Sequence, residues 1–256
     1  DYSRRNPDNP TPRSRRWLIR PGVIEDGEYI DKETKFDAAM DPTSPLVRNS
    51  VKTVERGVFD RILGVKKTSS GFQALGGGIM GRATEGKRPG GTPTALPGGN
   101  YIGADLDTPG TPLGLSLKKI RAACEGMELE DFGLETEDEI YGLITPVQKT
   151  DLINLAIETG KNLNPFEVEN IRNGKPGMLL GVNWLFSNRV PKDSSGNRLI
   201  PIWSKANVVA GVWQDVEGDM WNDTSAKNLP YIYTDAYIDC VRVEDLGVRI
   251  IRCAEA

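Results

Sequence analysis

One stretch of the sequence has the glycine and lysine spacing of a phosphate-binding loop. Gly81–Arg88 fits the pattern G-x-x-x-x-G-K, in which backbone amides and the lysine hold the phosphates of a nucleotide. Arg88 stands where a serine or threonine would bind Mg²⁺. Glycines before the pattern and Pro89-Gly90-Gly91 after it replace the strand and helix that such a loop needs. We therefore interpret it as a glycine-rich surface loop and expect no nucleotide hydrolysis through Lys87.

A run of carboxylates is the second candidate for chemistry. Between Glu128 and Glu139 the chain carries seven acidic side chains, whose oxygens suit a hard cation. Their spacing is not that of an EF-hand, so a solvated loop is the simpler interpretation. The chain has no histidine, and its cysteines (Cys124, Cys240 and Cys253) form no C-x-x-C pair. No catalytic, cofactor-binding or metal-binding residue is therefore assigned, and the chain is not expected to be an enzyme.

Composition limits the class of protein. The chain has 256 residues, 38% of them hydrophobic, and a formal net charge of −4, which does not favour a dedicated nucleic-acid binder. Its 17 prolines and 28 glycines predict many loops rather than a helical bundle. No apolar run approaches the ~20 residues needed to cross a bilayer, so no membrane partner is expected. The odd number of cysteines without a secretory signal favours reduced thiols in a cytosolic product.

The first 20 residues are polar and carry six arginines against two aspartates. A flexible solvated arm is one interpretation. The other is an arm that orders on a neighbouring subunit or on DNA phosphates. The arginines assigned to such contacts are Arg4, Arg5, Arg13, Arg15 and Arg16.

Trp17–Phe36 is predicted to form a hairpin, because Asp26-Gly27 is a strong two-residue turn signal. The segment has too few apolar residues for a core of its own, and isolated hairpins are marginal in water. Its apolar side chains are therefore expected to pack on another subunit. These side chains are Trp17, Leu18, Ile19, Tyr29 and Ile30.

A helix of about twenty residues, roughly 30 Å long, is predicted over Ser44–Gly64, with Ser44 as its N-cap and Gly64 as its stop. The next segment, Thr68–Asn100, is glycine-rich and predicted to be almost without regular structure, as functional or disordered loops are. Further helices are predicted at Leu115–Glu125, after Thr145-Pro146 and from Asn164-Pro165 to Gly174. Strands are predicted at Ile140–Ile144, Leu179–Phe186, Leu199–Trp203, Val208–Trp213, Tyr231–Val243 and Val248–Cys253.

The fold class is therefore α+β. An arm, a hairpin and a long loop that cannot stabilise themselves are expected of a subunit that its neighbours complete.

The order of several segments resembles that of a tailed-phage major capsid protein family. In that family an apolar strand with a central glycine leads to a lysine-asparagine turn, a long strand, an arginine and a closing valine-isoleucine strand. Upstream segments before the long helix and ahead of a Ser-Gly turn fit as well. The matching segments are Ile30–Glu33, Asp41–Pro45, Asn183–Pro191, Ala206–Val216, Ala226–Asn228, Tyr231–Tyr233, Arg242 and Val248–Cys253.

The resemblance implies the capsid fold that tailed phages share with herpesviruses. The fold would comprise an N-terminal arm, an extended hairpin loop, a long spine helix, a peripheral domain and an axial domain. The loop Thr68–Asn100 has no counterpart in this pattern. The implied boundaries are 1–16 for the arm, 17–36 for the hairpin, 44–64 for the spine, 65–114 for the glycine-rich loop, 115–160 with 224–256 for the peripheral domain, and 161–223 for the axial domain.

By the same resemblance, the chain would self-assemble into an icosahedral head shell around the phage genome. Its partners would be copies of itself in hexamers and pentamers, with scaffolding, portal or decoration proteins and non-specifically bound double-stranded DNA. It would need no cofactor, would be assembled in the cytoplasm of a bacterial host, and would be a virion component. Two alternatives stay open: an encapsulin-like bacterial shell protein, and a metal- or nucleotide-dependent hydrolase built on the acidic run or the glycine loop.

Overall fold

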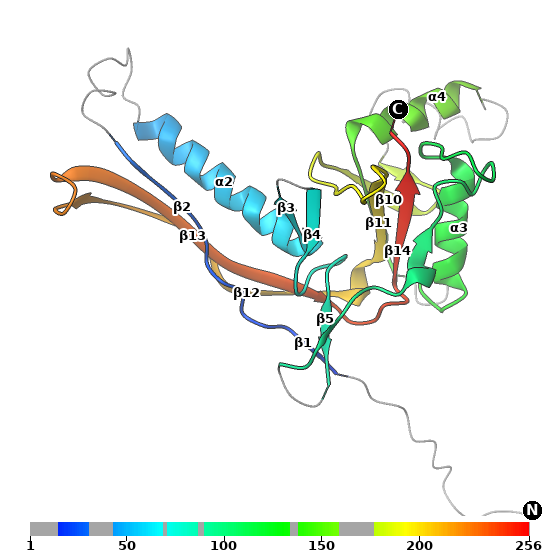
Figure 1. Cartoon of the computed structure of the whole chain (residues 1–256), viewed down its shortest axis with the longest axis horizontal. Helices are drawn as coiled ribbons and strands as arrows, with labels where there is room; N and C mark the ends of the chain where they lie inside the picture. Colours follow the sequence, from blue (N-terminus) through cyan, green and yellow to red (C-terminus); the bar gives the residue numbers. More distant parts are fainter. Residues whose placement is uncertain are drawn as a thin grey trace, which may run out of the picture.

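The computed structural model describes residues 15–30, 43–68, 71–86, 90–133, 138–158 and 177–255. Figure 1 shows an elongated molecule with a helix-and-sheet lobe at one end and a long, narrow sheet that extends away from it. The lobe and the long sheet meet near the middle of the molecule. Arg4, Arg5, Arg13, Lys87, residues 31–36 of the predicted hairpin and the helix predicted at 164–174 lie outside the described residues.

The lobe is built on a six-stranded mixed sheet. Its central strands are largely buried, as their nearly continuous apolar sequences predict; Ile144, Ile200 and Ile250 have no exposed surface. Parallel pairing joins Val182–Phe186 to Ile140–Ile144 and Val248–Cys253 to Tyr101–Ile102, and the other pairs of this sheet are antiparallel. In spatial order the strands are β7 (Tyr101–Ile102), β14 (Val248–Cys253), β11 (Arg198–Ser204), β8 (Ile140–Ile144), β10 (Val182–Phe186) and β9 (Met178–Leu179).

Two helices complete the lobe. Helix α3 (Leu117–Glu128) begins where the Ser116 hydroxyl accepts a hydrogen bond from the Lys119 amide at 3.2 Å, an ordinary N-cap. Ile120, Ala123 and Met127, at three- and four-residue spacing, are fully buried in the core of the lobe. Helix α4 (Pro146–Glu158) adds Leu152 to the same core. Short 3₁₀ turns, η1 (Gly98–Asn100) and η2 (Lys205–Asn207), lead into β7 and into the long sheet.

The long sheet consists of β12 (Val208–Asp223), β13 (Leu229–Arg242) and β2 (Ile24–Tyr29), with β13 in the middle. Helix α2 (Thr43–Leu63) lies along one face of it (Figure 1). Alternate β13 side chains, including Ile232 and Ala236, are buried on the side of the sheet where the hydroxyls of Ser50 in α2 and Thr234 are 3.0 Å apart. The helix begins at Thr43, so Ser44 lies within it and is not its N-cap.

The glycine-rich segment has more structure than its composition predicts. It contains a hairpin, β3 (Val65–Thr68) with β4 (Gly71–Ala74), and a small sheet in which β5 (Ala83–Glu85) pairs with β6 (Pro93–Thr94) and with β1 (Arg16–Trp17). Ile79, Met80 and Ala83 are buried, so the prediction of an almost structureless surface loop over 68–100 is wrong. Its glycines allow backbones to cross closely at the end of α2.

The predicted hairpin at Trp17–Phe36 is also wrong in its turn. Asp26-Gly27 lies inside β2, and that strand pairs with β13 over residues 231–236 rather than with a second limb of its own. Tyr231 packs over Gly27, and a Cβ at this position would force the Tyr231 ring to shift. The hairpin that the structure forms is β12–β13, closed by a turn at residues 224–228 in which Lys227 and Asn228 have φ of +55° and +59°.

The predicted division into peripheral and axial domains does not follow the sheets. The boundary at 223/224 would separate β12 from β13, although the two strands pair from Val208–Arg242 to Asp223–Leu229. The boundary at 160/161 would separate β8 from β10 and β11, to which β8 is hydrogen-bonded. The sheets instead group 101–102, 140–144, 178–186 and 198–204 with 248–253, and group 24–29 and helix α2 with 208–223 and 229–242.

Candidate assembly surface

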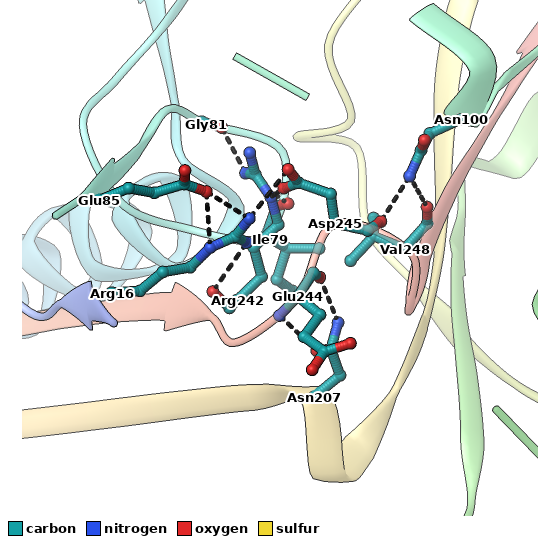
Figure 2. A network of polar contacts seen from close by, with 10 residues as sticks. All are labelled: Arg16, Ile79, Gly81, Glu85, Asn100, Asn207, Arg242, Glu244, Asp245 and Val248. Carbon is teal, nitrogen blue, oxygen red and sulfur yellow. Dashed lines mark hydrogen bonds and ion pairs between the residues drawn. The ribbon is translucent and has the colours of Figure 1, made fainter. Parts of the chain in front are cut away.

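A polar network ties the long sheet to the lobe where β13 leads into β14. The Arg242 side chain is fully buried; its Nε donates to Asp245 at 2.6 Å, and its Nη1 donates to the carbonyl of Gly81. Arg16, from β1, reaches the same carboxylate at 2.8 Å and Glu85 of β5 at 2.7 Å. Figure 2 shows these side chains converging from segments far apart in the chain.

Two asparagines complete the network (Figure 2). Asn100 donates to the carbonyl of Val248 at 2.9 Å, and Asn207 exchanges two hydrogen bonds with the backbone of Glu244 at 2.8 and 2.9 Å. Burial alone would raise the pKa of Asp245, but the hydrogen bonds from Arg16 and Arg242 outweigh it and hold this pKa below its usual value. The network therefore holds an ionised carboxylate between two guanidinium groups at the junction.

Only some of the five apolar side chains predicted to pack on another subunit are exposed on the surface. Trp17 is half-buried and donates to the Gly86 carbonyl at 2.9 Å, while Leu18 packs against Gly211 of β12. Ile30 is 3% exposed, so its burial is within this subunit and the expectation that it packs on a neighbour is wrong. Ile19 and Tyr29 are each 44% exposed.

The arginines predicted to contact DNA or a neighbour also differ in whether they are exposed. The Arg16 side chain is 10% exposed and bound to two carboxylates of its own chain. The sequence had suggested that it contacts DNA or a neighbour, but these two bonds already occupy it. Among the other four, Arg15 is exposed, and Arg4, Arg5 and Arg13 lie outside the described residues. Composition cannot reveal this difference, because the partners of Arg16 lie 69 and 229 residues further along the chain.

The sequence did not identify a set of exposed, large apolar side chains that lies along β12. We call this set of five large side chains the β12 strip. Among the described strands, β12 is hydrogen-bonded on one edge only, to β13. Exposed apolar side chains on an edge strand mark a site where another chain can bind. The β12 strip comprises Val209, Val212, Trp213, Met220 and Trp221; pairing with β13 places Val212 and Met220 on the α2 side of the sheet, and Val209 and Trp221 on the opposite side.

The two candidates for chemistry do not assemble into a site. Gly81 is buried against the end of α2, and a Cβ there would meet the backbone of Gly64 and Leu75, so no phosphate-sized space opens at this residue. In the acidic run, Glu139 is bound to Lys205 and to the Tyr141 hydroxyl, both at 2.9 Å. Over the described ranges, no group of three His, Cys, Asp or Glu side chains is arranged to hold a metal ion.

The three thiols and the helices add two observations. Cys124, Cys240 and Cys253 are free cysteines, and the Cys240 thiol donates to the carbonyl of Ile62 at 3.0 Å. Burial raises the pKa of the Cys240 and Cys253 thiols to about 12 in each case. Within the part of the chain that the structure describes, no helix combines the length and apolarity needed to span a bilayer.

Solved structures share this architecture. The chain superposes on a protein of Mycobacterium phage Adephagia with a TM-score of 0.59 and 11% identity, covering all of this chain and 80% of the other. The capsid of Myoviridae phage XM1 matches with a TM-score of 0.57 and 9% identity, over 91% of this chain and 73% of the other. An encapsulin from Synechococcus elongatus matches with a TM-score of 0.50 and 11% identity, over 90% of this chain and 70% of the other.

At such low identities these likenesses establish the fold alone, which is that of tailed-phage major capsid proteins. No curated protein matches the chain by sequence. A sequence model of the phage capsid protein family does match it, over residues 6–255. This chain therefore belongs to the phage capsid protein family and is a structural subunit of a phage head shell.

Proposed function

We propose that copies of this chain associate as hexamers and pentamers and close into an icosahedral shell around double-stranded phage DNA. The observation that carries the proposal is the β12 strip, which lies on a strand that is hydrogen-bonded to only one other described strand. Val212 and Met220 are 61% and 53% exposed, and burying each large apolar side chain would contribute roughly 1.5–3 kcal/mol. A neighbouring subunit can bury these side chains, and a shell repeats the same contact between many pairs of subunits.

Removing apolar surface from the β12 strip should therefore block assembly without unfolding the subunit. We expect the double variant Val212→Ser/Met220→Ser to keep the circular dichroism and melting temperature of the unmodified chain and to form no regular shells in electron micrographs. Leu129→Ser is the matched control, because Leu129 is 77% exposed on the lobe, away from β12, and its variant should assemble normally. Regular closed shells from the double variant would contradict this role of β12.

What the shell contains distinguishes a phage head from an encapsulin-like compartment. The likeness to the Synechococcus encapsulin is the observation behind this second candidate. We propose that particles contain nuclease-protected DNA rather than a cargo enzyme, and that assembly takes place in the cytoplasm of a bacterial host. Contacts with the DNA are proposed to be non-specific and steeply salt-dependent, because they release counterions from phosphates. Scaffolding, portal and decoration proteins are further proposed partners, and no catalytic step or cofactor enters this function.

A further inference from the structure

The face of the long sheet opposite α2 carries a cluster of aromatic side chains, which we call the aromatic face: Tyr29, Trp221, Tyr231 and Tyr233. The side chains of β13 alternate, so Ile232 and Thr234 lie beneath α2 while Tyr231 and Tyr233 lie on the other side. The ring centroids of Tyr29 and Tyr231 are 4.6 Å apart, and those of Trp221 and Tyr231 are 5.2 Å apart. Tyr29 and Trp221 are each 44% exposed, so this cluster is accessible to solvent in the single subunit.

Carboxylates surround these rings. Glu25 accepts a hydrogen bond from the Tyr233 hydroxyl at 2.7 Å, which raises the pKa of that phenol to about 12. Asp223 accepts one from the Tyr29 hydroxyl at 2.7 Å. Register puts Asp219 opposite Tyr233 on this face, and Glu217 in one row with Asp235 and Glu25. Strands β2, β12 and β13 contain no lysine or arginine apart from Arg242 at the junction, so this face is strongly negative.

Aromatic rings bordered by carboxylates are a good receptor for arginine, whose flat guanidinium group stacks on rings while its N–H groups donate to carboxylates. The chain contains one such contact already. The Arg20 guanidinium lies 5.8 Å from the ring centre of Tyr237, which is on the same face nearer the lobe. The part of the aromatic face around Tyr231, further from the lobe, offers the same chemistry.

We propose that the aromatic face is the docking site for the arginine-rich N-terminal segment, residues 1–15, of a second copy of this chain. That segment carries Arg4, Arg5, Arg13 and Arg15 against only Asp1 and Asp8. Its charge is therefore opposite to that of the face. The inference rests on the proposed shell-forming function and names one of the contacts between subunits.

Reach favours a second copy over the segment of the same chain. The Arg16 side chain donates to the Arg242 carbonyl at 3.3 Å, and Tyr231 lies eleven residues before Arg242 in β13, which is roughly 36 Å at the rise of a strand. A fully extended chain covers at most ~3.6 Å per residue, so Arg13 of the same copy falls far short. Arg4 and Arg5 would arrive only if the whole segment were stretched. The segment of a neighbour has no such tether.

Charge reversal on each side, and on both together, tests the contact. We expect Arg4→Glu/Arg5→Glu/Arg13→Glu, and separately Glu217→Arg/Asp219→Arg, to raise the subunit concentration needed for shells about tenfold at low salt. Combining the two sets should restore assembly, because the charges are exchanged. The matched control is Glu125→Arg/Glu128→Arg on α3, where the same charge change on exposed residues should have little effect. Variants that assemble like the unmodified chain would overturn the proposal.

A disulfide cross-link identifies the partner. In Arg5→Cys/Asp219→Cys, mild oxidation should give covalent dimers and higher multimers on non-reducing gels, with the single-cysteine variants as background. A cross-link confined to one chain would overturn docking on a neighbour. Loss of protected DNA with normal assembly in the arginine variant, and no cross-link, would assign the segment to DNA instead. If the unmodified chain forms no shells, the proposed function fails, and the cross-link in unassembled oligomers still decides the docking.

Discussion

At the scale of single residues, the side chains that hold this fold together pair charges that lie far apart in the sequence. Near the end of the chain, Glu255 accepts hydrogen bonds from both sides of the Arg198 guanidinium at 2.7 Å, from Lys192 at 2.6 Å and from Gln148 at 3.1 Å. Hydrogen bonding from Arg198 is the strongest influence on the pKa of Glu255, and burial opposes it. The net effect lowers this pKa from 4.5 to about 2.

Glu255 should therefore contribute to the acid sensitivity of the subunit. Above pH 4.5 the carboxylate is ionised in the folded and the unfolded chain, and its contacts stabilise the fold in full. As the pH falls from 4.5 to about 2, the unfolded chain binds the proton first, so this contribution is lost. Glu255→Gln should be less stable than the unmodified chain at pH 7 and should lose less stability over that window. Thermal melts of unassembled subunits measure both, and equal losses in the two proteins would contradict the assignment.

At the scale of elements, the end of α2 depends on close backbone approach. Gly64 follows the helix with φ of +76°, and a Cβ at this position would lie 2.5 Å from the Gly77 carbonyl oxygen and 2.6 Å from the Gly81 nitrogen. Neither backbone atom can move without disturbing β3 or the buried segment around Met80. The glycine-rich composition here therefore reflects the packing of one element on another.

Gly64→Ala should accordingly destabilise the subunit by about 2–4 kcal/mol, because it combines a left-handed backbone with two backbone collisions. Urea unfolding of the unassembled chain gives this difference. Gly98→Ala is the control: Gly98 has no positive φ and nothing within 4 Å of an added Cβ, so its variant should stay within ~0.5 kcal/mol. A Gly64 variant as stable as the Gly98 variant would show that the crossing is looser than the structure indicates.

At the scale of the whole molecule, the long sheet and the lobe keep a fixed relative position only if contacts at their junction stabilise it. The network around Arg242 supplies these contacts, since it connects β1, β5, η1, η2 and the start of β14 (Figure 2). A buried guanidinium is effective here because it donates in several directions at once.

Replacing Arg242 with methionine should cost about 3–5 kcal/mol, because it leaves Asp245 and the carbonyls of Ile79 and Gly81 without this donor in a buried site. Denaturant unfolding of the unassembled subunit measures the loss. Arg48→Met on the exposed side of α2 removes the same charge and should change stability by ~0.5 kcal/mol or less. Similar stabilities for the two variants would show that the junction does not depend on Arg242.

The sequence by itself determined the elements whose signal is local. Helix α2, the strands Ile140–Ile144 and Val248–Cys253, and the start of α4 at Pro146 were predicted within one or two residues, because periodicity and capping act over a few residues. The order of several weak segments also indicated the capsid family, and the family model confirms it.

Tertiary structure decided the rest. Asp26-Gly27 became part of a strand because pairing with β13, some 200 residues away in sequence, outweighed a local turn signal. The acidic stretch Asp215–Asp223 extended β12 beyond its predicted end at Trp213, because each of its sides could face solvent while its backbone bonded to β13. The burial of Arg16 and Ile30 and the exposure of the β12 strip depend on the same long-range pairing. Sequence patterns report only neighbours along the chain, whereas burial and pairing depend on neighbours in space.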